Sequence, residues 1–123
     1  MAKTCDSKIV GQIIFRGQDL LMIERKNYPQ SYALPAGHLD GDTFEDAAIR
    51  ETAEEVGVKV SENHEVWSGL VQNPCKRENG SHHTWKIFQA NSWSGVPKAG
   101  DDAKSFFWVS PENLRTMAAR TEY

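Results

Sequence analysis

The apolar residues at the start of the chain predict two β-strands. Apolar and polar positions in Lys8–Phe15 follow a strand-like pattern, and the continuous apolar run over 20–23 is typical of a second, well-buried strand. Residues 17–19, Gly-Gln-Asp, form a turn signal between them, so we expect the two strands to pair as a hairpin. A polar segment follows, and then a short apolar run over 32–34.

The next segment contains the clearest helix of the chain, which we expect over Thr43–Val56. Asp42 or Thr43 is a suitable N-cap, and Gly57 provides a stop. On a helical wheel at about 100° per residue, three carboxylates share one face: Glu51, Glu54 and Glu55. Four residues fall on roughly the opposite side, where we expect a core: Ile49, Thr52, Ala53 and Val56.

The second half of the chain predicts three more strands and a closing helix. We place strands over 65–71, 83–90 and 105–109. Ser110 then serves as the cap of a second helix, with Pro111 at its first position. Strands around one long helix, with another helix at the end, indicate a mixed α+β or α/β sandwich, and 123 residues fit one domain over 1–123.

Charge and composition exclude some classes of partner. The formal net charge is −3, from 14 basic and 17 acidic residues, which gives no general attraction to nucleic-acid polymers or anionic membranes. The net charge does not exclude a small anionic ligand that is bound at a local site. No apolar run approaches the roughly 18 residues of a membrane span, and Cys5 and Cys75 form no Cys-x-x-Cys motif. We therefore expect a reduced, cytoplasmic protein.

The three glutamates on one helical face carry an electrostatic cost. Like charges three or four residues apart destabilise a helix by roughly 0.2–0.5 kcal/mol per pair. Glu54 and Glu55 also lie in the last turn, where the helix dipole disfavours anions by about 0.3–1 kcal/mol each. A bound Mg²⁺ would relieve this repulsion, since carboxylate oxygens are its preferred ligands. For an isolated Glu-x-x-Glu-Glu, a solvated acidic face is the better interpretation. The surrounding sequence is therefore needed to distinguish a metal site from a solvated surface.

The residues around the glutamates form a specific motif. Between Gly37 and Val58 the chain carries Arg50-Glu51, then Glu54-Glu55, then a glycine followed by an aliphatic residue. This 22-residue stretch resembles the Nudix box, written as Gly, five residues, Glu, seven residues, Arg-Glu-aliphatic-x-Glu-Glu-x-Gly-aliphatic. A weaker resemblance to the family extends to three further segments: the early hairpin ending at Glu24-Arg25, the Leu34–His38 lead-in, and the Phe107–Leu114 segment.

Three positions depart from the family pattern. The spacing from Gly37 to Asp42 is one residue shorter, and Asp42 stands where a glutamate is usual. Both changes bear on the shape of the loop before the helix and on whether the main chain of Gly37 serves as a metal ligand. Thr52 replaces an aliphatic residue and affects packing on the buried face.

The resemblance implies a Nudix-type α/β/α sandwich with a mixed sheet and a hydrolase that attacks a diphosphate linkage with metal-activated water. It implies one to several Mg²⁺ ions, for which Mn²⁺ is a possible substitute, held by Glu51, Glu54 and Glu55 with Gly37 as a main-chain ligand. We expect Glu51 and Glu55 to be the main ligands and Glu54 to be a further ligand or the base. Asp101 and Asp102 are the acidic candidates for the base outside the motif, although an exposed turn explains them equally well.

Other residues are candidates for positioning and substrate binding. Arg50 resembles the family's arginine that orients a neighbouring glutamate, and Arg25 matches one that often touches substrate phosphate, although a solvated charge explains Arg25 nearly as well. His38 follows the motif glycine, and the resemblance implies that it shapes the loop. Four aromatic residues are able to stack on a base, although most buried aromatics belong to a core: Tyr32, Trp85, Phe88 and Trp108.

The substrate expected from the resemblance is a small-molecule nucleotide. The short chain resembles the compact MutT-like branch, which acts on nucleoside triphosphates. A nucleotide sugar or a dinucleotide polyphosphate is the alternative substrate, and a catalytically silent nucleotide sensor is the alternative function. A homodimer is possible, with Trp67 or Trp93 at the interface.

Overall fold

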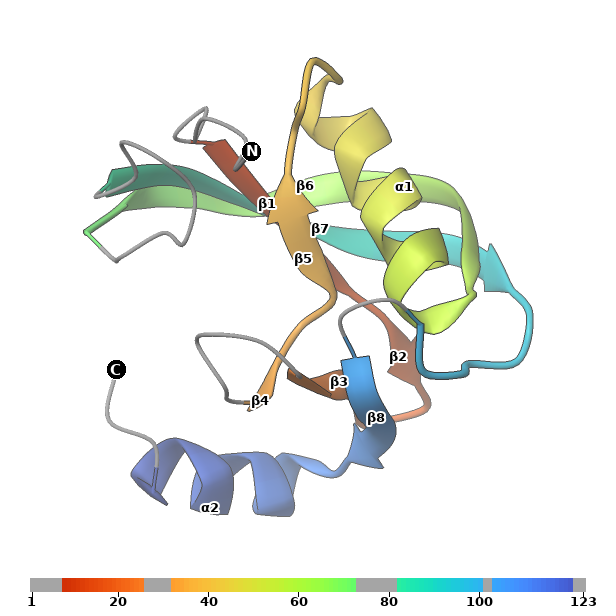
Figure 1. Ribbon diagram of the computed structural model, residues 1–123. Helices are drawn as coiled ribbons and strands as arrows, with labels where there is room; N and C mark the ends of the chain where they lie inside the picture. The colour runs from red at the N-terminus through yellow and green to blue at the C-terminus, as the bar shows by residue number, and fades with distance from the viewer. Residues whose placement is uncertain (1–7, 26–31, 73–81, 101–102, 121–123) are drawn as a thin grey trace.

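Two four-stranded sheets and two helices make up the computed structural model, which describes residues 8–25, 32–72, 82–100 and 103–120 (Figure 1). The first sheet has the order β5-β1-β7-β6, formed by Ala36–His38, Lys8–Ile13, His82–Ser94 and Lys59–Gln72. β1 pairs in parallel with β7, and the other neighbours are antiparallel. The prediction of a mixed sheet is therefore confirmed.

The second sheet is antiparallel and centres on β3. It contains β2 (Phe15–Arg16), β3 (Asp19–Arg25), β4 (Tyr32–Ala33) and β8 (Ala103–Val109). The prediction of one strand over Lys8–Phe15 was wrong, because the chain leaves the first sheet after Ile13 and enters the second at Phe15. Ile14 lies fully buried at this junction, and its carbonyl accepts from the Leu21 N–H at 3.0 Å.

Both helices begin where the sequence predicts. α1 (Phe44–Val56) is capped by the Thr43 hydroxyl, which accepts from the Asp46 N–H at 3.1 Å, and ends at Gly57 in the left-handed conformation, with φ of 68°. α2 (Pro111–Arg120) starts with its proline, and the Ser110 hydroxyl accepts from the Asn113 N–H at 3.2 Å. Within the described residues, neither helix is long and apolar enough to cross a membrane.

The strands lie between the two helices (Figure 1). α1 covers one face of the first sheet, where Ala47 and Ala48 pack on Val10 and Phe88. α2 lies at the second sheet, where Leu114 packs against a cluster of Leu20, Met22 and Val109. This arrangement confirms the sandwich implied by the sequence.

The long strands β6 and β7 extend beyond the predicted 65–71 and 83–90. The missed part of β6 contains the polar run Ser61-Glu62-Asn63-His64, which carries no strand-like apolar pattern. It is held instead by pairing with β7, across several register shifts. Just before it, the fully buried Val58 and Val60 pack with Val56 in the cluster beneath the C-terminal end of α1. This cluster fixes the end of α1 that carries the glutamates.

Candidate active site

The glutamates of α1 lie at the border of its buried face rather than opposite it. Glu55 is only 3% exposed, whereas Ala53, expected in the core, is exposed. Thr52 is buried as expected, and its hydroxyl donates to the Ala48 carbonyl at 2.7 Å, so the helix itself satisfies the polar group that replaces an aliphatic side chain. The helical wheel was wrong about Ala53 because the buried arc of α1 includes Glu55.

The shortened loop before α1 closes through a tight turn. The Asp42 N–H donates to the Leu39 carbonyl at 3.0 Å, and the two central residues, Asp40 and Gly41, have φ of 50° and 95°. Positive φ at both central positions is the mark of a type I′ turn, which Asp-Gly favours. With this turn in place, the Asp42 carboxylate reaches Arg50.

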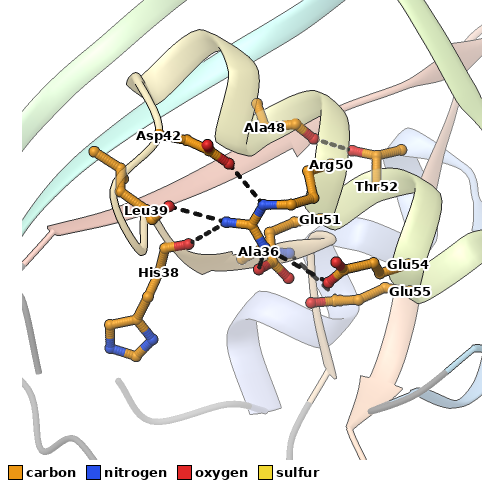
Figure 2. Close-up of polar contacts among 10 residues, drawn as sticks. All are labelled: Ala36, His38, Leu39, Asp42, Ala48, Arg50, Glu51, Thr52, Glu54 and Glu55. Carbon is orange, nitrogen blue, oxygen red and sulfur yellow. Dashed lines mark hydrogen bonds and ion pairs between the residues drawn. The ribbon is translucent and has the colours of Figure 1, made fainter. Parts of the chain in front are cut away.

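Arg50 connects this loop to the acidic face of the helix (Figure 2). Its Nε donates to Asp42 Oδ2 at 2.8 Å, and its Nη1 donates to Glu51 Oε1 at 2.8 Å. Its Nη2 donates to the carbonyls of His38 and Leu39, at 2.9 and 3.0 Å. A planar guanidinium is suited to holding several acceptors at once, so Arg50 sets the position of the loop relative to the Glu51 carboxylate.

Glu51 and Glu55 reach back from α1 to the strand β5. A Cβ built on Gly37 would overlap the Glu51 carboxylate carbon, which shows that this carboxylate lies directly on the glycine backbone. Glu55 Oε2 lies 3.4 Å from the Ala36 N–H, and the Glu51 and Glu55 side chains are within hydrogen-bond reach of each other. Figure 2 shows Glu54 beside them on the same side of the helix.

Burial and neighbouring charges act on both Arg50 and Glu51. Burial raises the pKa of the Glu51 carboxyl, against the opposing influence of the Arg50 charge, and the Glu54 charge adds to the increase. For Arg50, burial works to lower the pKa, but the hydrogen bond to Asp42 and the charges of Glu51 and Glu54 outweigh it, so the pKa is raised. The guanidinium stays charged, and the carboxylates gain from any further positive charge.

The donor set fits a hard divalent cation. The carboxylates of Glu51 and Glu55 are close together, with Glu51 against the backbone of Gly37 and Glu55 against the Ala36 N–H. The Glu54 side chain, 46% exposed, lies 3.6 Å from Arg50 Nη1. In the part of the chain that the structure describes, no three His, Cys, Asp or Glu side chains already form a metal-binding group. Mg²⁺ usually takes only one or two carboxylates, together with water and substrate phosphates, so this pair is sufficient to begin a site.

The other predicted site residues are more dispersed. His38 lies on β5, and its ring points away from the Arg50 contacts (Figure 2). Trp85 lies on β7, where its ring is close to Gly11, and its buried Nε1 has no hydrogen-bond partner among the residues that the structure describes. Since side chains alternate along a strand and Phe88 faces α1, Trp85 lies on the opposite face of the first sheet.

Tyr32 is exposed on β4 and makes an edge-on contact with Phe107, at 5.4 Å between ring centroids. The backbone of Arg25 ends β3, and nothing is described for its side chain. Asp101, Asp102 and both cysteines lie outside the described residues.

Two of the remaining aromatic residues pack with the core clusters, Phe88 as a buried member and Trp93 as a partly buried neighbour. Phe88 is 6% exposed and packs under α1, which favours the core role that the sequence left open as its alternative. Trp93 packs against Trp108, at 6.0 Å between ring centroids, instead of lying exposed. Arg16 covers Trp108, with its guanidinium carbon 4.4 Å from the ring centroid. Trp67, by contrast, is 50% exposed.

Sequence patterns missed the backbone partners of the site. The Ala36 N–H and the carbonyls of His38 and Leu39 hold functional side chains, but a backbone group carries no signal in its residue type. Gly100 was also missed, although its N–H donates to the carbonyl of Glu55 at 2.7 Å. A glycine shortly before a strand was the only available signal.

Comparison with known proteins identifies the family. The chain matches the family model of the NUDIX domain over residues 7–123. It is 35% identical over 114 residues to the ADP-ribose pyrophosphatase of Methanocaldococcus jannaschii, covering 89% of this chain and 64% of that protein. It is 31% identical over 104 residues to a putative 8-oxo-dGTP diphosphatase of Bacillus subtilis, covering 83% of this chain and 64% of that protein. The chain thus spans slightly less than two thirds of either relative.

Solved structures share the fold. A MutT NUDIX hydrolase from Burkholderia pseudomallei has a TM-score of 0.73 at 22% identity, covering 94% of this chain and 98% of that one. A bifunctional NMN adenylyltransferase/ADP ribose pyrophosphatase from Francisella tularensis, in complex with AMP and a Mn ion, has a TM-score of 0.67 at 25% identity, covering 98% of this chain and 38% of that one. The chain belongs to the Nudix family.

Proposed function

We propose that this protein is a pyrophosphohydrolase that cleaves the diphosphate linkage of a nucleoside-diphosphate derivative in the presence of Mg²⁺ or Mn²⁺. The observation that carries the proposal is the contact of the Glu51 carboxylate with the Gly37 backbone, next to Glu55. This contact gathers acidic oxygens and a glycine main chain into one site. Family membership and relatives named as a pyrophosphatase and a diphosphatase support the same activity.

Each residue of the site has a proposed role in this reaction. Glu51 and Glu55 would hold the cation, with the Gly37 carbonyl as a further ligand. Glu54 is the most exposed of the three glutamates, which suits either a ligand completed by substrate or the base that takes the proton of the attacking water. Arg50 keeps the Glu51 carboxylate oriented through the 2.8 Å hydrogen bond. When bound, the cation offsets the negative charge of the diphosphate and lowers the pKa of a coordinated water.

The substrate proposal covers two classes of nucleotide. One relative is named for ADP-ribose, which is a nucleotide sugar, and the other is named for 8-oxo-dGTP, which is an oxidised nucleoside triphosphate. Arg25, Tyr32, His38 and Trp85 stay candidates for substrate contacts. A nucleotide polymer is not expected, since the formal net charge is −3. The cytoplasmic location and a homodimer stay predictions from the sequence.

The direct test measures hydrolysis of a nucleotide panel with Mg²⁺, with Mn²⁺ and with EDTA. The panel contains ADP-ribose, 8-oxo-dGTP, the ordinary nucleoside triphosphates and a diadenosine polyphosphate. We expect metal-dependent release of a nucleoside monophosphate. Reaction in ¹⁸O-labelled water should place the label in one product phosphate, because water is the proposed nucleophile.

Two matched variants distinguish loss of a proposed metal ligand from loss of any negative charge on α1. Glu55→Gln should reduce kcat/KM by more than about 100-fold, since it removes a proposed ligand rather than an outer partner of one. Glu45→Gln changes an exposed glutamate in the first turn of the same helix and should leave the rate within about twofold of the unchanged protein. Nucleotide binding without turnover of any panel member would instead favour the catalytically silent sensor.

A further inference from the structure

The connection between β7 and β8 crosses the C-terminal end of α1 (Figure 1). Two backbone hydrogen bonds attach it there. The Lys98 N–H donates to the Val56 carbonyl at 2.8 Å, and the Gly100 N–H donates to the Glu55 carbonyl at 2.7 Å. The last carbonyls of a helix have no donor within the helix, so the connection supplies donors to two of them, at Glu55 and Val56.

Only glycine fits at position 100 in this arrangement. A Cβ built there would overlap the Glu54 carbonyl oxygen and lie 2.9 Å from the Glu55 carbonyl oxygen. Both atoms belong to the helix backbone, which cannot move aside as the end of a flexible side chain can. The backbone of Gly100 is outside the left-handed region, so space, not conformational freedom, is the reason for glycine here. Any larger residue must separate the connection from the helix or shift the last turn.

The position of that turn determines where the Glu55 carboxylate lies. The Glu55 side chain is 3% exposed and reaches the Ala36 N–H at 3.4 Å, so it has little freedom to compensate for a backbone shift. We propose that Gly100 is a positioning residue that holds Glu54 and Glu55 in register with Gly37 for cation binding. The inference rests on the proposed function, since it assumes that these glutamates bind the cation.

The test compares Gly100→Ala with the unchanged full chain. The probe is Mn²⁺ alone, and its binding to the substrate-free protein is measured by electron paramagnetic resonance. We expect Gly100→Ala to weaken Mn²⁺ binding about 10- to 100-fold, the range typical of residues that orient metal ligands. With nucleotide and saturating Mn²⁺, binding should recover and KM for the nucleotide should change by less than about threefold.

Two companion variants keep the result interpretable. Ala99→Ser changes the exposed neighbour without adding bulk against the helix, and should bind Mn²⁺ as the unchanged protein does. Lys98→Pro removes the hydrogen bond from the Lys98 N–H to the Val56 carbonyl without placing a Cβ against Glu54. This variant tests the proposal if Gly100→Ala does not fold. We expect it to weaken Mn²⁺ binding about threefold or more.

Thermal melting distinguishes positioning from general stability. If the folded variants melt at a lower temperature but bind Mn²⁺ as tightly as the unchanged protein, Gly100 has only a structural role and the inference is wrong. If the unchanged protein itself binds no Mn²⁺, the proposed cation site fails first, and the two failures are therefore separable.

Discussion

Replacing Gly37 by alanine should impair catalysis while leaving the fold intact. The new Cβ would lie 2.5 Å from Glu51 Oε1, whereas ordinary van der Waals contact begins at 3.4 Å. The obstructed group is the end of a flexible side chain, so the fold survives by moving the carboxylate. That movement displaces a proposed cation ligand and disturbs its 2.8 Å hydrogen bond with Arg50.

The distances set the size of the effect. The difference between 3.4 and 2.5 Å requires the carboxylate to retreat by about 1 Å. A misplacement of about 1 Å in an active site typically costs on the order of 100-fold in rate. This is about 2.7 kcal/mol of transition-state stabilisation, at 1.36 kcal/mol for each factor of ten.

The assay measures kcat/KM on the best substrate of the panel together with the urea midpoint of unfolding. Gly17→Ala is the matched control, because a Cβ there meets nothing within 4 Å but the residue has φ of 63°. A left-handed alanine costs about 1–2 kcal/mol, so this control should lose stability and keep its activity. Gly37→Ala should show the reverse pattern. A kcat/KM within threefold of the unchanged protein would show that catalysis does not need the Glu51 carboxylate against Gly37.

Three further predictions follow from α1. Arg50→Lys should lower kcat/KM about 10- to 100-fold, because one ammonium cannot span the guanidinium contacts from Asp42 to Glu51; an unchanged rate would count against Arg50 as a positioning residue. Thr43→Ala should lower the free energy of unfolding by about 1 kcal/mol through loss of the cap, measured by urea titration, with Thr43→Ser as a control that stays close to the original value. Glu51→Gln should gain stability relative to the unchanged protein as pH rises above about 4.3, the ordinary glutamate pKa. The pKa of Glu51 is raised in the folded state, so the folded protein binds more protons than the unfolded chain in this window, and deprotonation of Glu51 lowers stability there. Urea midpoints at pH 4 and pH 7 in EDTA test this, and a relative loss for Glu51→Gln at pH 7 would contradict it.

Local patterns predicted the helices but not the division into two sheets. The caps of α1 and α2 depend on residues within one turn, and both occur where the sequence places them. The break at Ile14 was hidden because Ile13, Ile14 and Phe15 form one apolar run, although they belong to different parts of the fold. The break depends on β1 pairing with β7, and a local pattern contains no information about that distant partner.

The same distinction applies to the candidate site. The resemblance to the family motif implied the contact of Arg50 with Glu51, and the two residues are neighbours on one helix. It did not predict that Glu55 is buried, because a helical wheel treats a carboxylate as solvated. The buried Glu55 carboxylate lies against the Ala36 N–H of β5, and the Glu55 backbone carbonyl accepts from Gly100. Both partners are backbone groups far along the chain, which residue types alone cannot locate.

The parallel pairing of β1 with β7 also governs the order in which this protein can fold. Lys8 lies beside Thr84, so a ribosome must synthesise most of the domain before the central strand gains its second neighbour. A 13-residue helix such as α1 is only marginally stable alone in water. The surface on which α1 packs is therefore incomplete until late in translation. Refolding should be slow, as is usual where contacts join distant parts of a chain.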